Sequence, residues 1–156
     1  MTVRRGSATA IAPVGADEVF ALLTDPSRLP EWNRIMTELS EAPSSLSPGC
    51  QWVVGFKAMR VMRWQSRSWC EEIDAEGHRL VYRSGTDDGN PSYALWTWVV
   101  EDRPDGTSQV RVEWELHPKT FLRRHLLSRV RNWMLRREVP ASLQELGAAA
   151  AASRAG

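Results

Sequence analysis

The segment 12–33 constrains the fold of this chain most. It contains an apolar stripe at helical spacing, made of Val19, Phe20, Leu22 and Leu23. Asp25-Pro26 ends that helix, and Pro26 then suits the first turn of a second short helix, which we expect to end at Pro30. Helices this short are unstable alone in water, so both must pack against another element. We expect that element to be a sheet.

Seven stretches between short turns have the pattern of β-strands. They cover residues 2–11, 37–41, 51–59, 62–74, 78–84, 93–101 and 109–116. Turn signals such as Pro48-Gly49 and Glu76-Gly77 separate them. Such short connections favour an antiparallel sheet, in which successive residues alternate between two faces.

That alternation predicts which side chains share the inner face. It is clearest in the last strand, where Val110, Val112, Trp114 and Leu116 alternate with charged residues. By the same alternation, we expect nine further side chains to face inward: Trp52, Val54, Phe56, Leu80, Tyr82, Ser84, Trp96, Trp98 and Val100. Several of these residues are large and aromatic.

The strand 62–74 is compatible with either orientation. One alternative turns inward Trp64, Ser66, Ser68, Cys70 and Glu72, and the other turns inward Arg63, Gln65, Arg67, Trp69, Glu71 and Ile73. We favour the first, because it keeps two arginines in water and because its small side chains would leave room for a ligand.

A long helix should follow the strands. It begins at Lys119 or Thr120, runs toward Leu146, and carries an apolar stripe that would fill the grip of a curved sheet, made of Leu122, Leu126, Val130, Trp133 and Met134. We therefore expect one domain over residues 1–146. The Ala-rich segment 147–156 has little to bury, and we expect it to fray.

The order of these motifs resembles a known family. A strand ending in Ala12-Pro13, a Glu-Val-Phe helix and the run from Asp25 to Asn33 are similar to the N-terminal signature of the START-like or Bet v 1-like (SRPBCC) superfamily, particularly its bacterial polyketide cyclase/dehydratase branch. The resemblance covers about residues 5–146. It implies an α+β helix-grip fold: a curved seven-stranded antiparallel sheet with two short helices and one long helix enclosing a cavity. The superfamily holds enzymes, carriers and receptors, so the fold does not fix the function.

Composition narrows the functional classes. A net charge of +1 gives no sign of general nucleic-acid binding. No apolar run suits a transmembrane span or a signal peptide, so we expect a cytoplasmic location. Cys50, Cys70 and the three histidines lack metal-ligand spacing, and no catalytic triad or phosphate loop is visible. We expect neither a metal nor a nucleotide cofactor.

The eight tryptophans suggest a binding site. We expect a cavity for a hydrophobic, aromatic or polyketide-like molecule, lined by Trp52, Val54, Phe56, Trp64, Ser66, Ser68, Cys70, Trp96, Trp98 and Trp114, with Leu126, Val130 and Met134 from the helix. The residues alone favour a filled core instead, and the family resemblance shifts the expectation toward a cavity.

Glu72 and Tyr82 are the candidate catalytic pair. If both face inward on neighbouring strands, burial would raise the carboxyl pKa of Glu72 and suit it to acid or base chemistry on an enolisable ketone. The resemblance implies such chemistry, because polyketide cyclases, aromatases and dehydratases work by positioning and proton transfer. Alternatively, Glu72 forms a surface ion pair with Arg63 or Arg83, and the protein is a non-catalytic carrier.

The long helix is also strongly basic. Its arginines, Arg123, Arg124, Arg129, Arg131, Arg136 and Arg137, would suit an acidic acyl-carrier protein or an anionic membrane surface. The other interpretation is a solvated helix face that pairs with sheet carboxylates such as Glu113 and Glu115.

Overall fold

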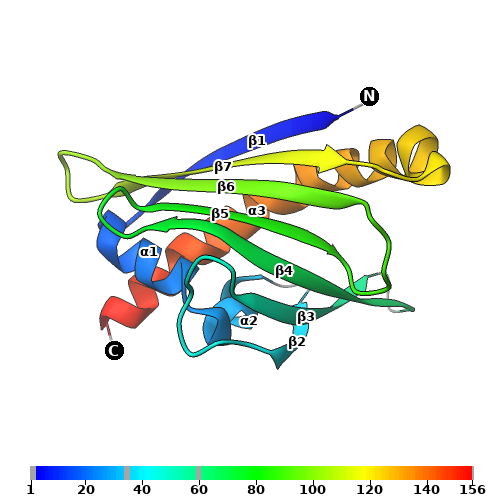
Figure 1. The fold of residues 1–156 in the computed structure, drawn as a ribbon. Coiled ribbons are helices and arrows are strands. Elements are labelled where there is room, and N and C mark those ends of the chain that lie inside the picture. The colour runs from blue at the N-terminus through cyan, green and yellow to red at the C-terminus, as the bar shows by residue number, and fades with distance from the viewer. Residues whose placement is uncertain (1–2, 34–35, 59–60, 156) are drawn as a thin grey trace.

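The computed structural model describes residues 3–33, 36–58 and 61–155. Its elements follow in the order β1 (Arg4–Ala12), α1 (Ala16–Leu23), η1 (Pro26–Arg28), α2 (Leu29–Trp32), β2 (Met36–Glu41), β3 (Gln51–Ala58), β4 (Met62–Asp74), β5 (Arg79–Thr86), β6 (Tyr93–Asp102), β7 (Ser108–His117), η2 (Arg123–Leu127) and α3 (Ser128–Ala155). The predicted α+β architecture is confirmed (Figure 1). Residues 2 and 59, placed in strands by the sequence, and residue 156 of the predicted tail lie outside the described residues.

The strands form one antiparallel sheet in the order β1-β7-β6-β5-β4-β3-β2. Helix α3 runs behind this curved sheet in Figure 1, alongside the edge strand β1. Two hydrogen bonds hold it there: Arg4 Nε donates to Ser128 Oγ at 3.0 Å, and Arg136 Nη2 donates to the Arg5 carbonyl at 3.2 Å. This arrangement is the predicted helix grip.

The short helices α1 and α2 cover one end of the sheet. The backbone N–H of Ala16 donates to Asp102 Oδ1 at 2.8 Å, which ties the start of α1 to the end of β6. In α2, Trp32 packs edge-to-face on Trp98 with ring centroids 5.8 Å apart. Pro30 lies inside the first turn of α2 rather than ending a helix as predicted, because proline at this position loses no helical hydrogen bond.

Helix α3 extends further than the sequence predicts. The prediction that residues 147–156 fray for lack of anything to bury is wrong over 147–155, which are helical and include the buried Gly147 and Ala150. A Cβ atom built on Gly147 would lie 3.3 Å from Cα and Cβ of Ala12 and 3.5 Å from Cδ of Pro13. The small residues therefore permit a close approach between α3 and the end of β1.

Candidate functional site

Strand register assigns the side chains of the inner face. Phe56 lies opposite Trp64, Trp52 opposite Ser68, and Cys70 opposite Tyr82. Ser66, Ser68 and Cys70 are all buried on this face, while Arg67 points to the outer one. The favoured orientation of strand 62–74 is thus the one observed from Trp64 to Cys70.

Aromatic rings cross the inner face from strand to strand. Ring centroids are 5.3 Å apart between Trp52 and Tyr82, 6.3 Å between Tyr82 and Trp96, and 6.1 Å between Trp96 and Trp114. A second pair, Phe56 and Trp64, stacks at 5.3 Å. These contacts link aromatic rings from β3 to β7 across the inner face.

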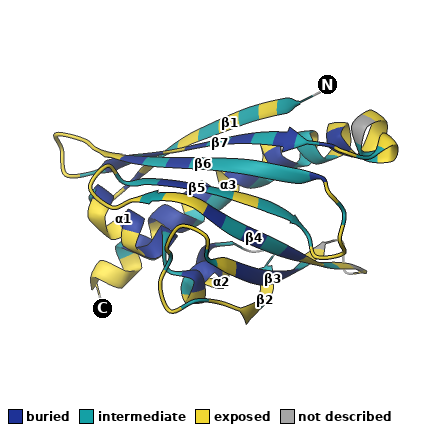
Figure 2. Ribbon diagram, in the orientation of Figure 1, coloured by how far each residue is buried: buried dark blue, intermediate teal, exposed yellow. Residues whose placement is uncertain are grey.

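The two ends of this inner face differ in burial (Figure 2). We call the packed end the part covered by α1, α2 and the C-terminal half of α3, where the inward side chains are buried, among them Leu80, Trp98, Val100, Val110 and Leu143. We call the open end the part near the start of β4 and β6, where the inward side chains are only half-buried and include Phe56, Trp64, Tyr82, Ala94 and Trp96. The open end is the candidate site.

Of the predicted lining residues, the structure brings only some to the open end. Phe56, Trp64 and Trp96 lie there, whereas Trp52, Val54, Ser66, Ser68, Cys70, Trp98 and Trp114 are buried within the packing. From the helix, Met134 is half-buried, but Leu126 and Val130 are 56% and 47% exposed and enclose nothing. The prediction that those two fill the grip is wrong, because periodicity identifies a shared helix face but not what that face contacts.

Several polar groups lie among the rings. The indole N–H of Trp96 donates to Ser84 Oγ and that of Trp114 to Asn132 Oδ1, both at 2.9 Å. Burial raises the pKa of Tyr82 to about 12, and the nearby Trp98 indole lowers that pKa slightly. The Trp98 indole N–H still has no acceptor at hydrogen-bond geometry among the described residues. The Tyr82 hydroxyl therefore stays protonated at neutral pH.

Glu72 does not share the inner face with Tyr82. A β-bulge between Cys70 and Glu72 places two residues of β4 against one of β5, so that Glu72 lies opposite Val81 on the outer face. Its carboxylate accepts a hydrogen bond from Arg79 Nε at 3.1 Å, and the side chain is half exposed. The predicted pairing of Glu72 with Tyr82 is therefore wrong, and a bulge leaves no signal in the alternation that could have revealed it.

No carboxylate replaces Glu72 among the described inward positions of β3, β4 and β5. Burial, with smaller effects from the neighbouring Cys50, raises the pKa of the Cys70 thiol to about 11, so Cys70 is not a ready nucleophile. Within the described ranges, no group of three or more His, Cys, Asp or Glu residues is arranged to hold a metal ion. The Tyr82 hydroxyl is a proton donor at the site.

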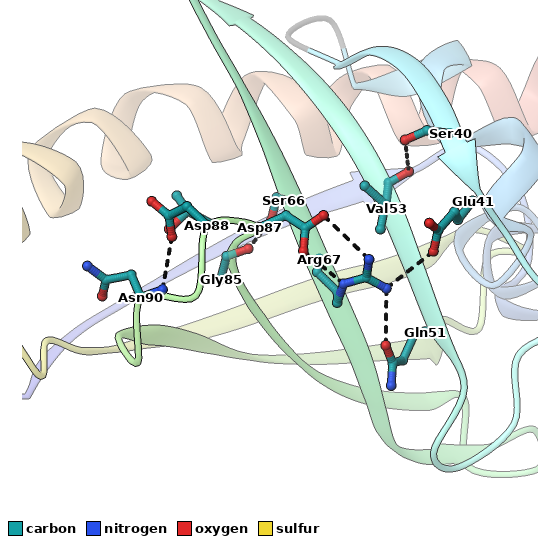
Figure 3. Close-up of polar contacts among 11 residues, drawn as sticks. Ser40, Glu41, Gln51, Val53, Ser66, Arg67, Gly85, Asp87, Asp88 and Asn90 are labelled. Carbon is teal, nitrogen blue, oxygen red and sulfur yellow. Dashed lines mark hydrogen bonds and ion pairs between the residues drawn. The ribbon is translucent and has the colours of Figure 1, made fainter.

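On the outer face of the sheet, Arg67 links β4 to strands β2 and β3 (Figure 3). Its guanidinium donates to Asp87 Oδ1 at 2.9 Å and to Glu41 Oε2 and Gln51 Oε1, each at 3.2 Å. The hydrogen bond to Asp87 is the main reason that the pKa of Arg67 is raised. This network joins β2, β3 and β4 to the β5–β6 loop, and so holds the strands that carry Phe56 and Trp64.

The sequence reasoning missed one feature beside the open end. At η2 and the start of α3, bulky apolar side chains stand in solvent: Phe121, Leu122, Leu126, Leu127, Val130 and Trp133. The arginines that alternate with these apolar residues in the sequence were the available sign that this segment faces solvent. Arg123 Nη2 donates to Thr86 Oγ1 at 3.1 Å, which places this exposed segment next to the end of β5.

Comparisons with known proteins agree with the fold. The model of the family described as polyketide cyclase/dehydrase and lipid transport matches residues 4–151. No curated protein matches the chain in sequence. None of the described helices meets the length and apolarity that a membrane span requires.

Three solved structures illustrate the similarity. Ara h 8.0201 has a TM-score of 0.73 at 15% identity, over 97% of this chain and 99% of its own. A Thermus thermophilus protein has a TM-score of 0.71 at 19% identity, over 96% and 99%. A Streptomyces aromatase/cyclase has a TM-score of 0.70 at 15% identity, over 96% and 94%. At these identities the similarity establishes the fold alone.

Proposed function

Because the chain belongs to the polyketide cyclase/dehydrase and lipid transport family, we propose that its open end binds a hydrophobic, aromatic or polyketide-like small molecule. One observation carries the proposal: Phe56, Trp64, Tyr82 and Trp96 face the same side of the sheet and remain half-buried. Partly exposed aromatic rings lose contact with water when a flat molecule covers them. Each 100 Å² of apolar surface covered contributes about 2.5 kcal/mol, at about 25 cal/mol per Å².

The site favours binding over acid/base catalysis. A catalyst that enolises a ketone needs a base whose pKa lies near the working pH. Glu72 is on the outer face, and the pKa of Tyr82, about 12, is too high for a base at neutral pH. The Tyr82 hydroxyl can donate a hydrogen bond to a ligand carbonyl. We therefore propose a binding or carrier role, with an aromatase/cyclase activity as the second candidate, supported by that one donor.

A matched pair of substitutions on β4 tests the binding site. Trp64 lies on the inner face, and Trp69 lies on the outer face beside Arg83 and Tyr93. With the neutral fluorescent probe N-phenylnaphthylamine, we expect Trp64→Leu to weaken binding about tenfold. That follows from losing about 60 Å² of covered apolar surface, or about 1.5 kcal/mol. Trp69→Leu should leave the affinity unchanged. If Trp69→Leu alone weakens binding, the probe sits on the outer face and the proposal fails.

The substitution Tyr82→Phe separates the two candidate functions. It removes the hydroxyl and keeps the ring that contacts Trp52 and Trp96. A carrier should lose little affinity for an apolar ligand, and its wild-type form should not convert a poly-β-ketone substrate. An enzyme should convert that substrate and lose turnover in Tyr82→Phe while it still binds the probe.

A further inference from the structure

We propose that the basic tip, which we define as residues 119–137, docks this protein onto an anionic lipid bilayer. The tip comprises the lead-in to η2, η2 itself and the first ten residues of α3. This inference concerns a second surface, and it does not depend on which ligand the open end binds.

The apolar side chains of the tip are the first observation. Phe121 is 80% exposed, and Leu122, Leu126, Val130 and Trp133 follow at helical spacing with 47–59% of their surface in solvent. A helix face of this composition is normally buried in a soluble protein. Here no described element covers it, since the body of α3 packs against β1 further along.

The charge of the tip is the second observation. Residues 119–137 contain seven Lys and Arg residues and no Asp or Glu, a formal charge of +7. The whole chain has 20 basic and 19 acidic residues, so the remainder carries 13 basic and 19 acidic residues, or −6. The near-neutral total conceals a strong separation of charge. The tip would attract an anionic surface while the rest of the molecule is repelled by it.

Several of these cations form no ion pair with a carboxylate that the structure describes. Arg123 lies 3.9 Å from a carboxylate oxygen of Asp88, and Arg131 lies 3.2 Å from one of Glu138. Within the described part of the chain, no ion pair to a carboxylate is formed by Arg129, Arg136 or Arg137. Arg137 instead stacks over the ring of Trp133 at 4.1 Å. An arginine on a tryptophan is suited to the boundary between lipid headgroups and acyl chains.

Shape favours a bilayer over an acidic protein. In Figure 1 the coil at η2 projects beyond the end of the sheet, and in Figure 2 it is largely exposed. Lipids can rearrange around a projecting tip and accept bulky apolar side chains among their acyl chains, while their phosphates meet the arginines. A folded acidic partner would need a matching hollow to cover the same side chains. The bonds from Arg123 to Thr86 and from Arg4 to Ser128 would hold the docked tip beside the sheet.

Vesicle co-sedimentation of the full chain tests the proposal. We expect binding to vesicles of phosphatidylcholine with phosphatidylglycerol, at least tenfold weaker binding to phosphatidylcholine alone, and a marked loss between about 0.1 M and about 0.5 M salt. Leu126→Ser should weaken binding by about tenfold. Ile11→Ser is the matched control, because Ile11 is also an exposed apolar residue, at 51%, but lies outside the tip.

A charge variant and a folding control complete the test. Arg129→Gln with Arg137→Gln should reduce vesicle binding and its salt dependence, while N-phenylnaphthylamine still binds as in the unmodified protein. Equal binding to neutral and anionic vesicles would overturn the proposal, as would vesicle binding that survives both tip variants. The proposal would also be wrong if the unmodified chain does not bind vesicles. In that case, tip variants that disrupt a dimer, or that no longer bind an acidic carrier protein, would identify the tip as a protein-binding surface. Loss of N-phenylnaphthylamine binding in every variant would contradict the proposed binding site at the open end.

Discussion

The packed end and the open end are two parts of one sheet face, built from the same kinds of residue. Trp98 at the packed end and Trp96 two residues earlier on β6 both point inward, yet Trp98 is buried and Trp96 is only half-buried. The difference lies in what covers them, because α2 places Trp32 on Trp98 and no ring from a helix reaches Trp96 among the described contacts. Coverage by helices, and not strand composition, therefore decides which inward rings of the sheet stay partly exposed.

The largest effect should come from matched leucines on the C-terminal helical segment. Leu143 is 1% exposed at the packed end, whereas Leu126 stands in solvent. Leu143→Ala should lower the free energy of unfolding by about 3 kcal/mol, because it leaves a cavity. Leu126→Ala should change it by less than about 0.5 kcal/mol. Urea denaturation of both variants gives the two values, and similar values would contradict the difference in burial between Leu143 and Leu126.

The contribution of Tyr82, at the open end, to the free energy of unfolding should depend on pH. Its folded pKa of about 12 exceeds the ordinary value of about 10 for tyrosine, because burial disfavours the phenolate. The preference of the folded state for the protonated hydroxyl therefore contributes to stability. This contribution is fully present below about pH 10 and is lost as the pH rises through about 12. It amounts to at most about 2.7 kcal/mol, at about 1.36 kcal/mol for each pKa unit.

Unfolding measured from pH 9 to about 12 tests this sign. Stability of the unmodified protein should fall more steeply over that window than stability of Tyr82→Phe. Parallel curves for the two proteins would mean that the Tyr82 hydroxyl is solvated, which would contradict the burial that raises its pKa.

The close approach at Gly147 tests how tightly the packed end is built. Gly147→Leu should destabilise the protein by about 2 kcal/mol, because the new side chain would press on Ala12 and Pro13. Ala148 is exposed on the next position of the same helix, and Ala148→Leu should be nearly neutral. Thermal unfolding of the pair measures the difference. A Gly147→Leu variant as stable as Ala148→Leu would show that α3 is not held against β1.

The smallest effect should be that of Glu72→Gln. The ion pair with Arg79 is exposed, so its loss should cost less than about 0.5 kcal/mol. Affinity for N-phenylnaphthylamine should not change. A loss of affinity as large as that of Trp64→Leu would place the Glu72 carboxylate on the inner face and contradict the bulge.

Much of this fold was predictable from its sequence, and the failures have physical causes. Period-two alternation and turn residues locate the strands to within about two residues. Alternation cannot anticipate the extra residue of the bulge, so Glu72 was placed on the wrong face. An Ala-rich segment looks featureless, although small residues such as Gly147 allow close packing. Periodicity assigns the stripe at Leu126 and Val130 to the core, because nothing in the sequence of a single helix specifies what its apolar face contacts.

The most direct test of the account follows the indole N–H resonances of the tryptophans during titration with N-phenylnaphthylamine. Single Trp→Phe variants assign the signals. We predict that the resonances of Trp64 and Trp96, at the open end, shift on binding, while those of Trp32 and Trp98, at the packed end, stay in place. Shifts confined to Trp69 or Trp133, or saturating fluorescence with no shift at Trp64 and Trp96, would contradict the claim that the open end is the binding site.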